Sequence, residues 1–285
     1  MIKKNHNNTK NKEIVKTKIM GILNVTPDSF YDGGKYNKTE LAIKHAEEMI
    51  EEGADIIDIG GESTRPWAVP ISPEEEKERV LPVISELRKI NKDIPISIDT
   101  YKSEVAEEAI DMGATIVNDV SGLQFDKNMP EVISKKNVSV IIMHIKGTPR
   151  DMQINPTYED VVKEIKEFLK ERIEYATENG INKRNIFIDP GIGFGKTTEH
   201  NLEILKRLKE FKELGFPVVL GTSRKSFIGR ILGTEENPIP PEERLEGSIA
   251  TYVWAVIQGV DILRVHDVKQ TKMALKVIDR IINSK

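Results

Sequence analysis

The chain has 285 residues, of which 38% are hydrophobic and 31% are charged, and its 42 basic and 46 acidic side chains give a net charge of −4. That length suffices for one large domain or two ordinary ones, since domains usually contain about 100–200 residues and α/β barrels about 250. The slightly acidic balance lacks the clustered Lys and Arg that bind nucleic acid, so no nucleic-acid partner is expected. The absence of cysteine excludes disulfides, Cys-ligated zinc and iron–sulfur clusters, and fits a cytoplasmic location.

Residues 1–18 differ in composition from the rest of the chain. They contain six Lys and four Asn with only scattered aliphatic side chains, which is typical of a disordered basic tail and not of a secretion signal. The apolar stretches elsewhere are far shorter than the roughly 20 residues that a membrane helix needs. We therefore expect no membrane partner, and a single folded domain over residues 19–285.

That domain alternates short apolar runs with helical patterns. Continuous Val and Ile content, without strict alternation, is typical of strands buried on both faces of a parallel sheet. Ser72 and Pro73 mark a helix start, and several further segments each carry one apolar face. Eight units without a dividing linker favour a closed (β/α)8 TIM barrel of the α/β class. The predicted strands are 19–24, 55–60, 95–99, 115–119, 138–144, 186–189, 217–222 and 261–266, and the predicted helices include 72–91, 157–179, 199–214, 242–259 and 269–283.

Polar groups follow every predicted strand, at the end of the barrel where such folds build their active sites. Asp119 and Asp267 are most simply interpreted as caps of the next helix. The remaining set is too concentrated to be left without a ligand, because buried polar groups are costly unless they are satisfied. These strand-end groups are Asn24, residues 60–65, Asp99, Asn118, His144, Asp189, residues 222–225 and residues 264–266.

Three loops are candidates for covering the barrel mouth. Residues 191–197 (GIGFGKT) match neither a P-loop nor a dinucleotide fingerprint, so we interpret them as a glycine-rich loop that carries Phe194 over the mouth. Loops 26–37 and 63–73 are long and rich in polar groups, as expected of flaps that close over a polar substrate. His45 and His200 fall on predicted helices as surface groups, and no zinc motif is present.

The strand-end residues resemble those of the dihydropteroate synthase family. The resemblance runs from about residue 18 to the C-terminus, with departures at Trp67, where the family often has Gly, and at Ile145. It implies a transferase that joins 6-hydroxymethyl-7,8-dihydropterin pyrophosphate to 4-aminobenzoate and releases pyrophosphate. The motifs in order are NVTPDSF (24–30), DGG (32–34), DIGGESTRP (58–66), SIDT (97–100), ND (118–119), DPGIGFGK (189–196), SRKS (223–226) and RVHD (264–267).

The resemblance also implies roles for individual residues. A pterin presents two adjacent donors, N3–H and the 2-amino group, which the Asp189 carboxylate can accept, and its O4 and N5 acceptors suit Lys225 and Asn118. Asn24 corresponds to a ligand of Mg²⁺, the expected cofactor, and Asp32 to a flexible loop. The catalytic set is Asp99, Lys225, Arg264 and His266; the pterin pyrophosphate set is Thr64, Asp99, Asn118, Asp189, Lys225, Arg264, Val265 and His266; and the aminobenzoate set is Thr64, Arg65, Pro66, Phe194 and Ser226.

Two alternatives to the synthase stay open. One is a methyltransferase that passes a methyl group from methyltetrahydrofolate to a corrinoid protein, and the other is a non-catalytic pterin-binding protein. The family likeness further implies a homodimer. The apolar residues Tyr252, Trp254, Val256 and Ile257 make segment 242–259 a candidate surface for it, although they can equally pack on the barrel.

Overall fold

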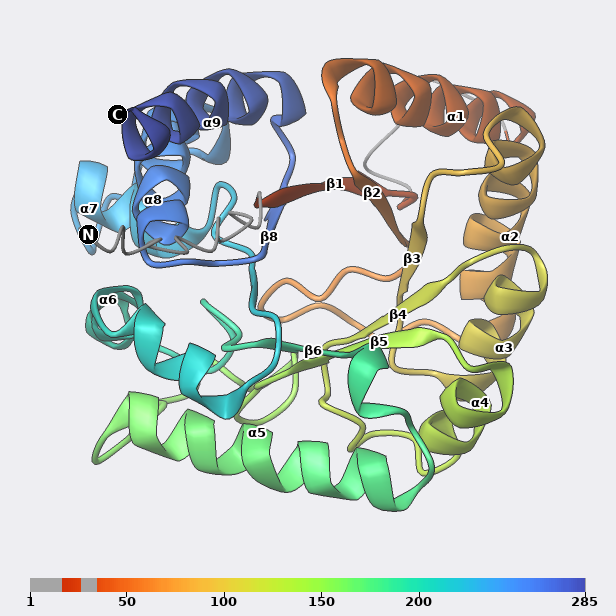
Figure 1. Cartoon of the computed structure of the whole chain (residues 1–285), viewed down its shortest axis with the longest axis horizontal. Helices are drawn as coiled ribbons and strands as arrows, with labels where there is room; N and C mark the ends of the chain where they lie inside the picture. Colours follow the sequence, from red (N-terminus) through yellow and green to blue (C-terminus); the bar gives the residue numbers. More distant parts are fainter. Residues whose placement is uncertain (1–16, 27–34, 285) are drawn as a thin grey trace, which may run out of the picture.

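The computed structural model describes residues 17–26 and 35–284 and contains the predicted eight-stranded parallel barrel (Figure 1). The strands pair in the order β6-β5-β4-β3-β2-β1-β8-β7, every pair is parallel, and a parallel bridge between Ile188 and Val218 joins the two ends of the sheet. The strands are β1 (Lys18–Asn24), β2 (Ile56–Gly60), β3 (Ile96–Asp99), β4 (Ile116–Asp119), β5 (Ser139–Met143), β6 (Ile186–Asp189), β7 (Val219–Leu220) and β8 (Ile262–Val265).

Helices surround the barrel on its outer side (Figure 1). The five predicted helices are present, except that predicted helix 199–214 divides at Arg207 into an α-helix and a 3-10 segment. Helices α3, α4 and α7, which are not among the predicted helices, have nine residues or fewer, and such short segments are hard to recognise from the sequence pattern. The helices are α1 (Lys35–Glu52), α2 (Pro73–Ile90), α3 (Ser103–Asp111), α4 (Met129–Lys136), α5 (Val161–Glu178), α6 (Thr198–Lys206), α7 (Ser226–Leu232), α8 (Leu245–Ile257) and α9 (Val268–Asn283), with 3-10 segments η2 (Lys183–Asn185), η3 (Leu208–Leu214) and η4 (Pro241–Glu243).

Side-chain caps fix where several helices begin. The Ser72 hydroxyl accepts the backbone N–H of Glu75 at the start of α2, and the Asp160 carboxylate accepts two backbone N–H groups at the start of α5. His200, predicted as a surface group, instead completes a capping box with Thr197 at the start of α6. The predicted loop 26–37 is wrong at its end, because α1 begins at Lys35, and Asp32 lies outside the described residues.

The interior of the barrel is apolar at one end and polar at the other. Its apolar floor is one buried cluster inside the strands, formed by Met20, Ile56, Ile116, Ile141, Val219 and Ile262. Because side chains of a strand alternate between its two faces, the residues two positions further along each strand share that inward face. Asp58, Asn118 and Arg264 follow Ile56, Ile116 and Ile262 in this way. These three side chains form a polar layer directly on the apolar floor.

The N-terminal end of the described chain is part of the fold. The Thr17 hydroxyl donates to the Val260 carbonyl at 2.9 Å, and Lys18 pairs with Ile262 at the start of β1. The predicted tail boundary is therefore wrong at these two residues, because the strand gains a partner in β8 that the composition of the segment does not reveal. Residues 1–16 lie outside the described part of the chain. Within the described ranges, no helix is long and apolar enough to cross a membrane.

Candidate active site

Arg264, on β8, hydrogen-bonds to side chains from two other strands, and one of these binds a side chain from a third strand. Its Nε donates to Asp58 Oδ2 and its Nη2 donates to Asp99 Oδ2, both at 2.6 Å, and the Asn118 amide donates to the same Asp58 oxygen at 3.2 Å. The structure thus brings Asp99, Asn118 and Arg264 together, as their strand-end positions predict. Asp58 was not among the predicted site residues, although a charged residue inside the apolar run IIDIG is itself a signal of a buried polar role.

Burial and opposite charge compete within this group. Burial raises the pKa of Asp99 to about 7, even though the neighbouring Arg264 guanidinium opposes that rise. Burial disfavours the charge of Arg264, but Asp58 and Asp99 outweigh it and raise the pKa of that guanidinium above its usual range. Asp58 Oδ1 and Asp99 Oδ1 are buried and make no hydrogen bond to the described residues. The polar layer therefore offers acceptor oxygens that a ligand with N–H groups can satisfy.

Asp189 and Lys225 are two further charged side chains at the barrel mouth, beside the group of Asp58, Asp99 and Arg264. Asp189 ends β6, and one of its oxygens accepts the backbone N–H of Gly191 at 2.7 Å. Burial raises the pKa of Asp189, against the influence of the Lys225 charge. Burial likewise lowers the pKa of Lys225 to about 8, with Asp189 acting in the opposite direction. Lys225 Nζ donates to the Ile192 carbonyl and lies 4.5 Å from the centre of the Phe194 ring.

The glycine-rich loop that carries Phe194 is fixed on several sides. Gln153 Nε2 donates to the Gly193 carbonyl at 2.6 Å, the Gly193 N–H donates to Asn201 Oδ1 at 2.8 Å, and the Tyr158 hydroxyl donates to the Gly195 carbonyl at 2.8 Å. Gly191 has φ +68°, and a Cβ there would lie 1.9 Å from the His144 carbonyl oxygen, so only glycine fits. The predicted loop is present, and its path is set by contacts that the motif alone does not show.

His266 is oriented by Ser223. The Ser223 hydroxyl oxygen accepts the His266 backbone N–H at 3.1 Å and lies 2.8 Å from His266 Nδ1. We assign the hydroxyl proton to this second contact, which leaves the ring proton on Nε2, where it can be donated to a ligand. Burial, reinforced by the positive charge of Arg264, lowers the pKa of His266 to about 4. The imidazole is therefore neutral near pH 7.

Neither strand-end carboxylate interpreted as a helix cap forms a side-chain cap of the next helix. The interpretation of Asp119 is wrong because Asp119 accepts the Ser121 N–H and hydroxyl and the Leu123 N–H in its own turn, whereas α4 begins only at Met129. Asp267 was predicted wrongly as a side-chain cap: it makes no such bond at the start of α9 and instead pairs with Arg224 Nε and Nη2 at 2.9 and 2.6 Å. The physical reason is that the bidentate pair with a guanidinium satisfies both of its oxygens.

Loop 63–70, which carries Thr64, Arg65 and Pro66, is anchored at its base. Glu62 Oε2 accepts the Ile71 N–H at 3.1 Å and an ammonium proton of Lys102 at 2.6 Å, so it joins the two ends of the loop. The Arg65 charge is among the groups that lower the pKa of His266. Trp67, in the loop, has φ +68°, a backbone conformation that favours the Gly expected at this position from the family resemblance.

Asn24 and Ser226 also lie at the mouth of the barrel. Asn24 ends β1 opposite Gly60, and its carboxamide makes no hydrogen bond to the described residues. Ser226 is the exposed first residue of α7. Across the described ranges, no group of three or more His, Cys, Asp or Glu residues is placed to hold a metal.

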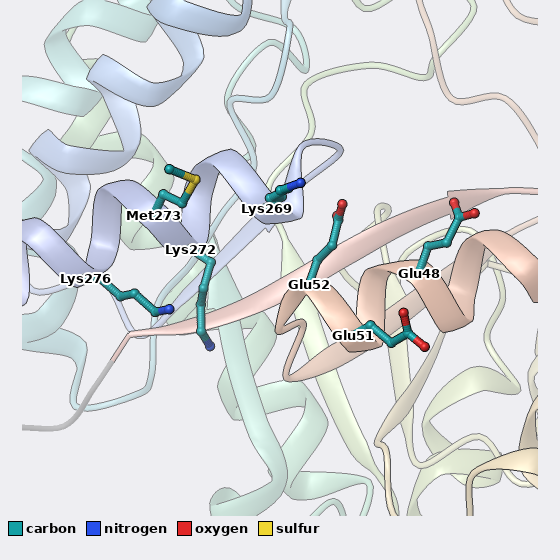
Figure 2. Close-up of a pocket in the computed structure, with 7 residues that line it drawn as sticks. All are labelled: Glu48, Glu51, Glu52, Lys269, Lys272, Met273 and Lys276. Carbon is teal, nitrogen blue, oxygen red and sulfur yellow. The ribbon is translucent and has the colours of Figure 1, made fainter.

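A hollow between α1 and α9 contains none of the strand-end residues (Figure 2).

Comparison with known proteins gives a consistent result. A family model described as pterin binding enzyme matches residues 20–266. The dihydropteroate synthase of Clostridium beijerinckii is 50% identical over 268 residues, which cover 94% of this chain and 95% of that protein. A structure of the Clostridium difficile dihydropteroate synthase in the presence of pteroic acid has a TM-score of 0.87 and 52% identity over 95% of this chain and 98% of that one. The Xanthomonas albilineans enzyme with 4-aminobenzoic acid has a TM-score of 0.88 and 44% identity, covering 95% of both chains.

Proposed function

Because this chain belongs to the dihydropteroate synthase family of pterin-binding enzymes, we propose which of its strand-end side chains carry out the family's reaction. The chain is a transferase of folate biosynthesis that condenses 6-hydroxymethyl-7,8-dihydropterin pyrophosphate with 4-aminobenzoate to give 7,8-dihydropteroate and pyrophosphate. The observation that carries the assignment of roles is the pair of Asp189, which is buried, and Lys225, which is half-buried, beside the Asp58–Arg264–Asp99 group.

Asp189 recognises the donor edge of the pterin. One oxygen is held by the Gly191 N–H at 2.7 Å, which fixes the plane of the carboxylate. The fixed carboxylate accepts the adjacent N3–H and 2-amino donors of the ring. Lys225 and Asn118 donate to the O4 and N5 acceptors, and Asp99 faces the remaining ring nitrogens. This division matches each donor of the ligand to an acceptor of the site.

The reaction depends more on stabilising the charges that develop on the pterin and on the leaving pyrophosphate than on a strong base. The amine nitrogen of 4-aminobenzoate forms a bond to the pterin methylene carbon, the carbon–oxygen bond to pyrophosphate breaks with its electron pair on the leaving oxygen, and the amine loses one proton to solvent. Positive charge spreads into the pterin ring as that bond breaks, and the fixed carboxylate of Asp99 stabilises it. Arg264 and the Nε2–H of His266, together with Val265, hold the pyrophosphate.

Asn24 fits a Mg²⁺ ion that takes most of its ligands from pyrophosphate and water. Its carboxamide oxygen, which accepts no hydrogen bond from the described residues, is a hard ligand of the kind that Mg²⁺ prefers. A single protein ligand is consistent with this way of binding. When bound, the ion neutralises negative charge on the leaving group. Asn24 itself orients that end of the substrate.

The second substrate binds above the pterin. Phe194 lies on the glycine-rich loop, Ser226 begins α7, and loop 63–70 carries Arg65, whose charge lowers the pKa of His266. We assign 4-aminobenzoate to these loops and leave the rigid strand ends to the pterin. The residues assigned to 4-aminobenzoate are Thr64, Arg65, Pro66, Phe194 and Ser226, with Thr64 also near the pyrophosphate.

The same proposal includes a cytoplasmic homodimer. On α8, Tyr252 and Val256 pack on the barrel, while Trp254 and Ile257 are 43% and 47% exposed. Leu232 at the end of α7 is exposed as well, and α7 contacts α8. An apolar surface of this kind supports an interface between copies of the chain.

Measuring pyrophosphate release tests the function. We expect one pyrophosphate per 7,8-dihydropteroate formed, dependent on 4-aminobenzoate, and loss of both products in Lys225→Met. The matched control is Lys206→Met, at a side chain 76% exposed on α6, which should retain full activity. A corrinoid methyltransferase would release no pyrophosphate, and a non-catalytic binder would retain the pterin without turnover.

A further inference from the structure

Lys196 is a buried amine that none of the roles above uses. It lies at the end of the glycine-rich loop, and the residue is 1% exposed. Its Nζ donates to the Phe194 carbonyl at 2.8 Å and lies 2.9 Å from His144 Nδ1. Among the described residues, no carboxylate lies within 4.0 Å of this nitrogen, so it forms no ion pair there.

An ammonium group buried without a counter-ion is costly. Burial lowers the pKa of Lys196 well below its usual range, the Lys225 and Lys146 charges act in the same direction, and Asp189 opposes them. Burial also lowers the pKa of His144, whose ring packs edge-on against Phe168 with centres 4.8 Å apart. The contact between Lys196 Nζ and His144 Nδ1 therefore joins the end of β5 to the loop after β6.

These bonds fix the backbone of Phe194 from both sides. The Phe194 N–H donates to the Gly191 carbonyl at 3.1 Å, and its carbonyl accepts from Lys196. The next residue, Gly195, has φ +67° and lacks a side chain that could restrain the peptide between Phe194 and Gly195. With its two backbone groups held, Phe194 presents its ring to Lys225 at 4.5 Å. Removing the Lys196 amine would leave the carbonyl without its donor and release this peptide.

We propose that Lys196 is a positioning residue for the second substrate: it fixes Phe194 so that the ring lies against Lys225 and completes the 4-aminobenzoate pocket. The inference rests on the proposed role of Phe194 in that pocket. It assigns Lys196 no contact with either substrate, so its removal should affect the two substrates unequally.

The test is a comparison of Michaelis constants. Lys196→Met retains the stem and removes the amine, and we expect the KM for 4-aminobenzoate to rise about tenfold while the KM for the pterin pyrophosphate changes less than about twofold. Lys206→Met is the matched control and should change neither. If Lys196→Met does not fold, as judged by thermal melting, His144→Phe removes one of the two partners and should raise the KM for 4-aminobenzoate by a smaller factor. Equal changes in both KM values, or none, would overturn the proposal.

A double-mutant cycle separates this inference from the proposed pocket. Phe194→Ala alone should raise the KM for 4-aminobenzoate, and adding Lys196→Met should then have little further effect, because both changes remove the same contact. If Phe194→Ala has no effect, the pocket assignment is wrong. If Phe194→Ala raises the KM but the two changes are additive, the pocket stands and the positioning role of Lys196 is wrong.

Discussion

Asp189→Asn is the substitution whose effect the geometry specifies most closely. One carboxylate oxygen accepts the Gly191 N–H at 2.7 Å inside a loop where only glycine fits. The amide that replaces it must keep its oxygen on that N–H, since the opposite orientation would set two donors against each other in the loop. Its NH2 group then faces the pterin, where two further donors point.

The magnitude follows from the lost interactions. A hydrogen bond to a charged group contributes about 1.5–3 kcal/mol, and leaving a buried polar group unsatisfied costs about 1–3 kcal/mol. We therefore expect a loss of about 3 kcal/mol, or about 150-fold in Kd. The assay is isothermal titration calorimetry with the pterin pyrophosphate and Mg²⁺, without 4-aminobenzoate.

Asp119→Asn supplies the matched control for that titration. Asp119 is also a buried strand-end carboxylate, but its hydrogen-bond partners all lie in its own turn. We expect this variant to melt at a lower temperature and to bind the pterin within about threefold of the wild-type Kd. An Asp189→Asn protein that binds as tightly as the wild type would refute the assignment of the pterin edge.

Three further predictions concern pH, metal and orientation. The kcat/KM for the pterin pyrophosphate should rise as Asp99 ionises near pH 7 and fall as Lys225 loses its proton near pH 8. Asp99→Asn should remove the acid limb of this pH profile, and a flat profile in the wild type would contradict both roles. Asn24→Ala should lower kcat about tenfold or more at low Mg²⁺ and recover in part as Mg²⁺ is raised; full wild-type activity in EDTA would exclude the metal role. Ser223→Ala should lower kcat about tenfold by freeing the His266 ring, with little change in melting temperature; unchanged turnover would show that the ring needs no such support.

The sequence predicts the barrel well because apolar strands buried on both faces leave a local signature. It also predicts which residues gather at the barrel mouth, since the carboxyl ends of parallel strands must meet at one end of a barrel. Asp99, Asn118 and Arg264 accordingly come together. The sequence pattern did not single out short helices such as α3 and α4, which have nine and eight residues, because so few residues complete only about two turns.

The partners of buried charges could not be predicted, because they depend on which strands become neighbours. Asp58 is 206 positions from Arg264, and the two meet only once β2 and β8 flank β1. Lys196 is 52 positions from His144, and nothing in the motif GIGFGK indicates that its lysine turns inward. Asp267 has the local sequence of a cap, but a guanidinium 43 positions away satisfies it.

A crystal structure of the chain with pteroic acid, the ligand present with the Clostridium difficile enzyme, tests the central claim most directly. We predict that the N3 and 2-amino edge lies within about 3 Å of the Asp189 carboxylate, with the benzoate end toward Phe194 and loop 63–70. A pterin bound with that edge away from Asp189, or in the hollow between α1 and α9 (Figure 2), would contradict the account.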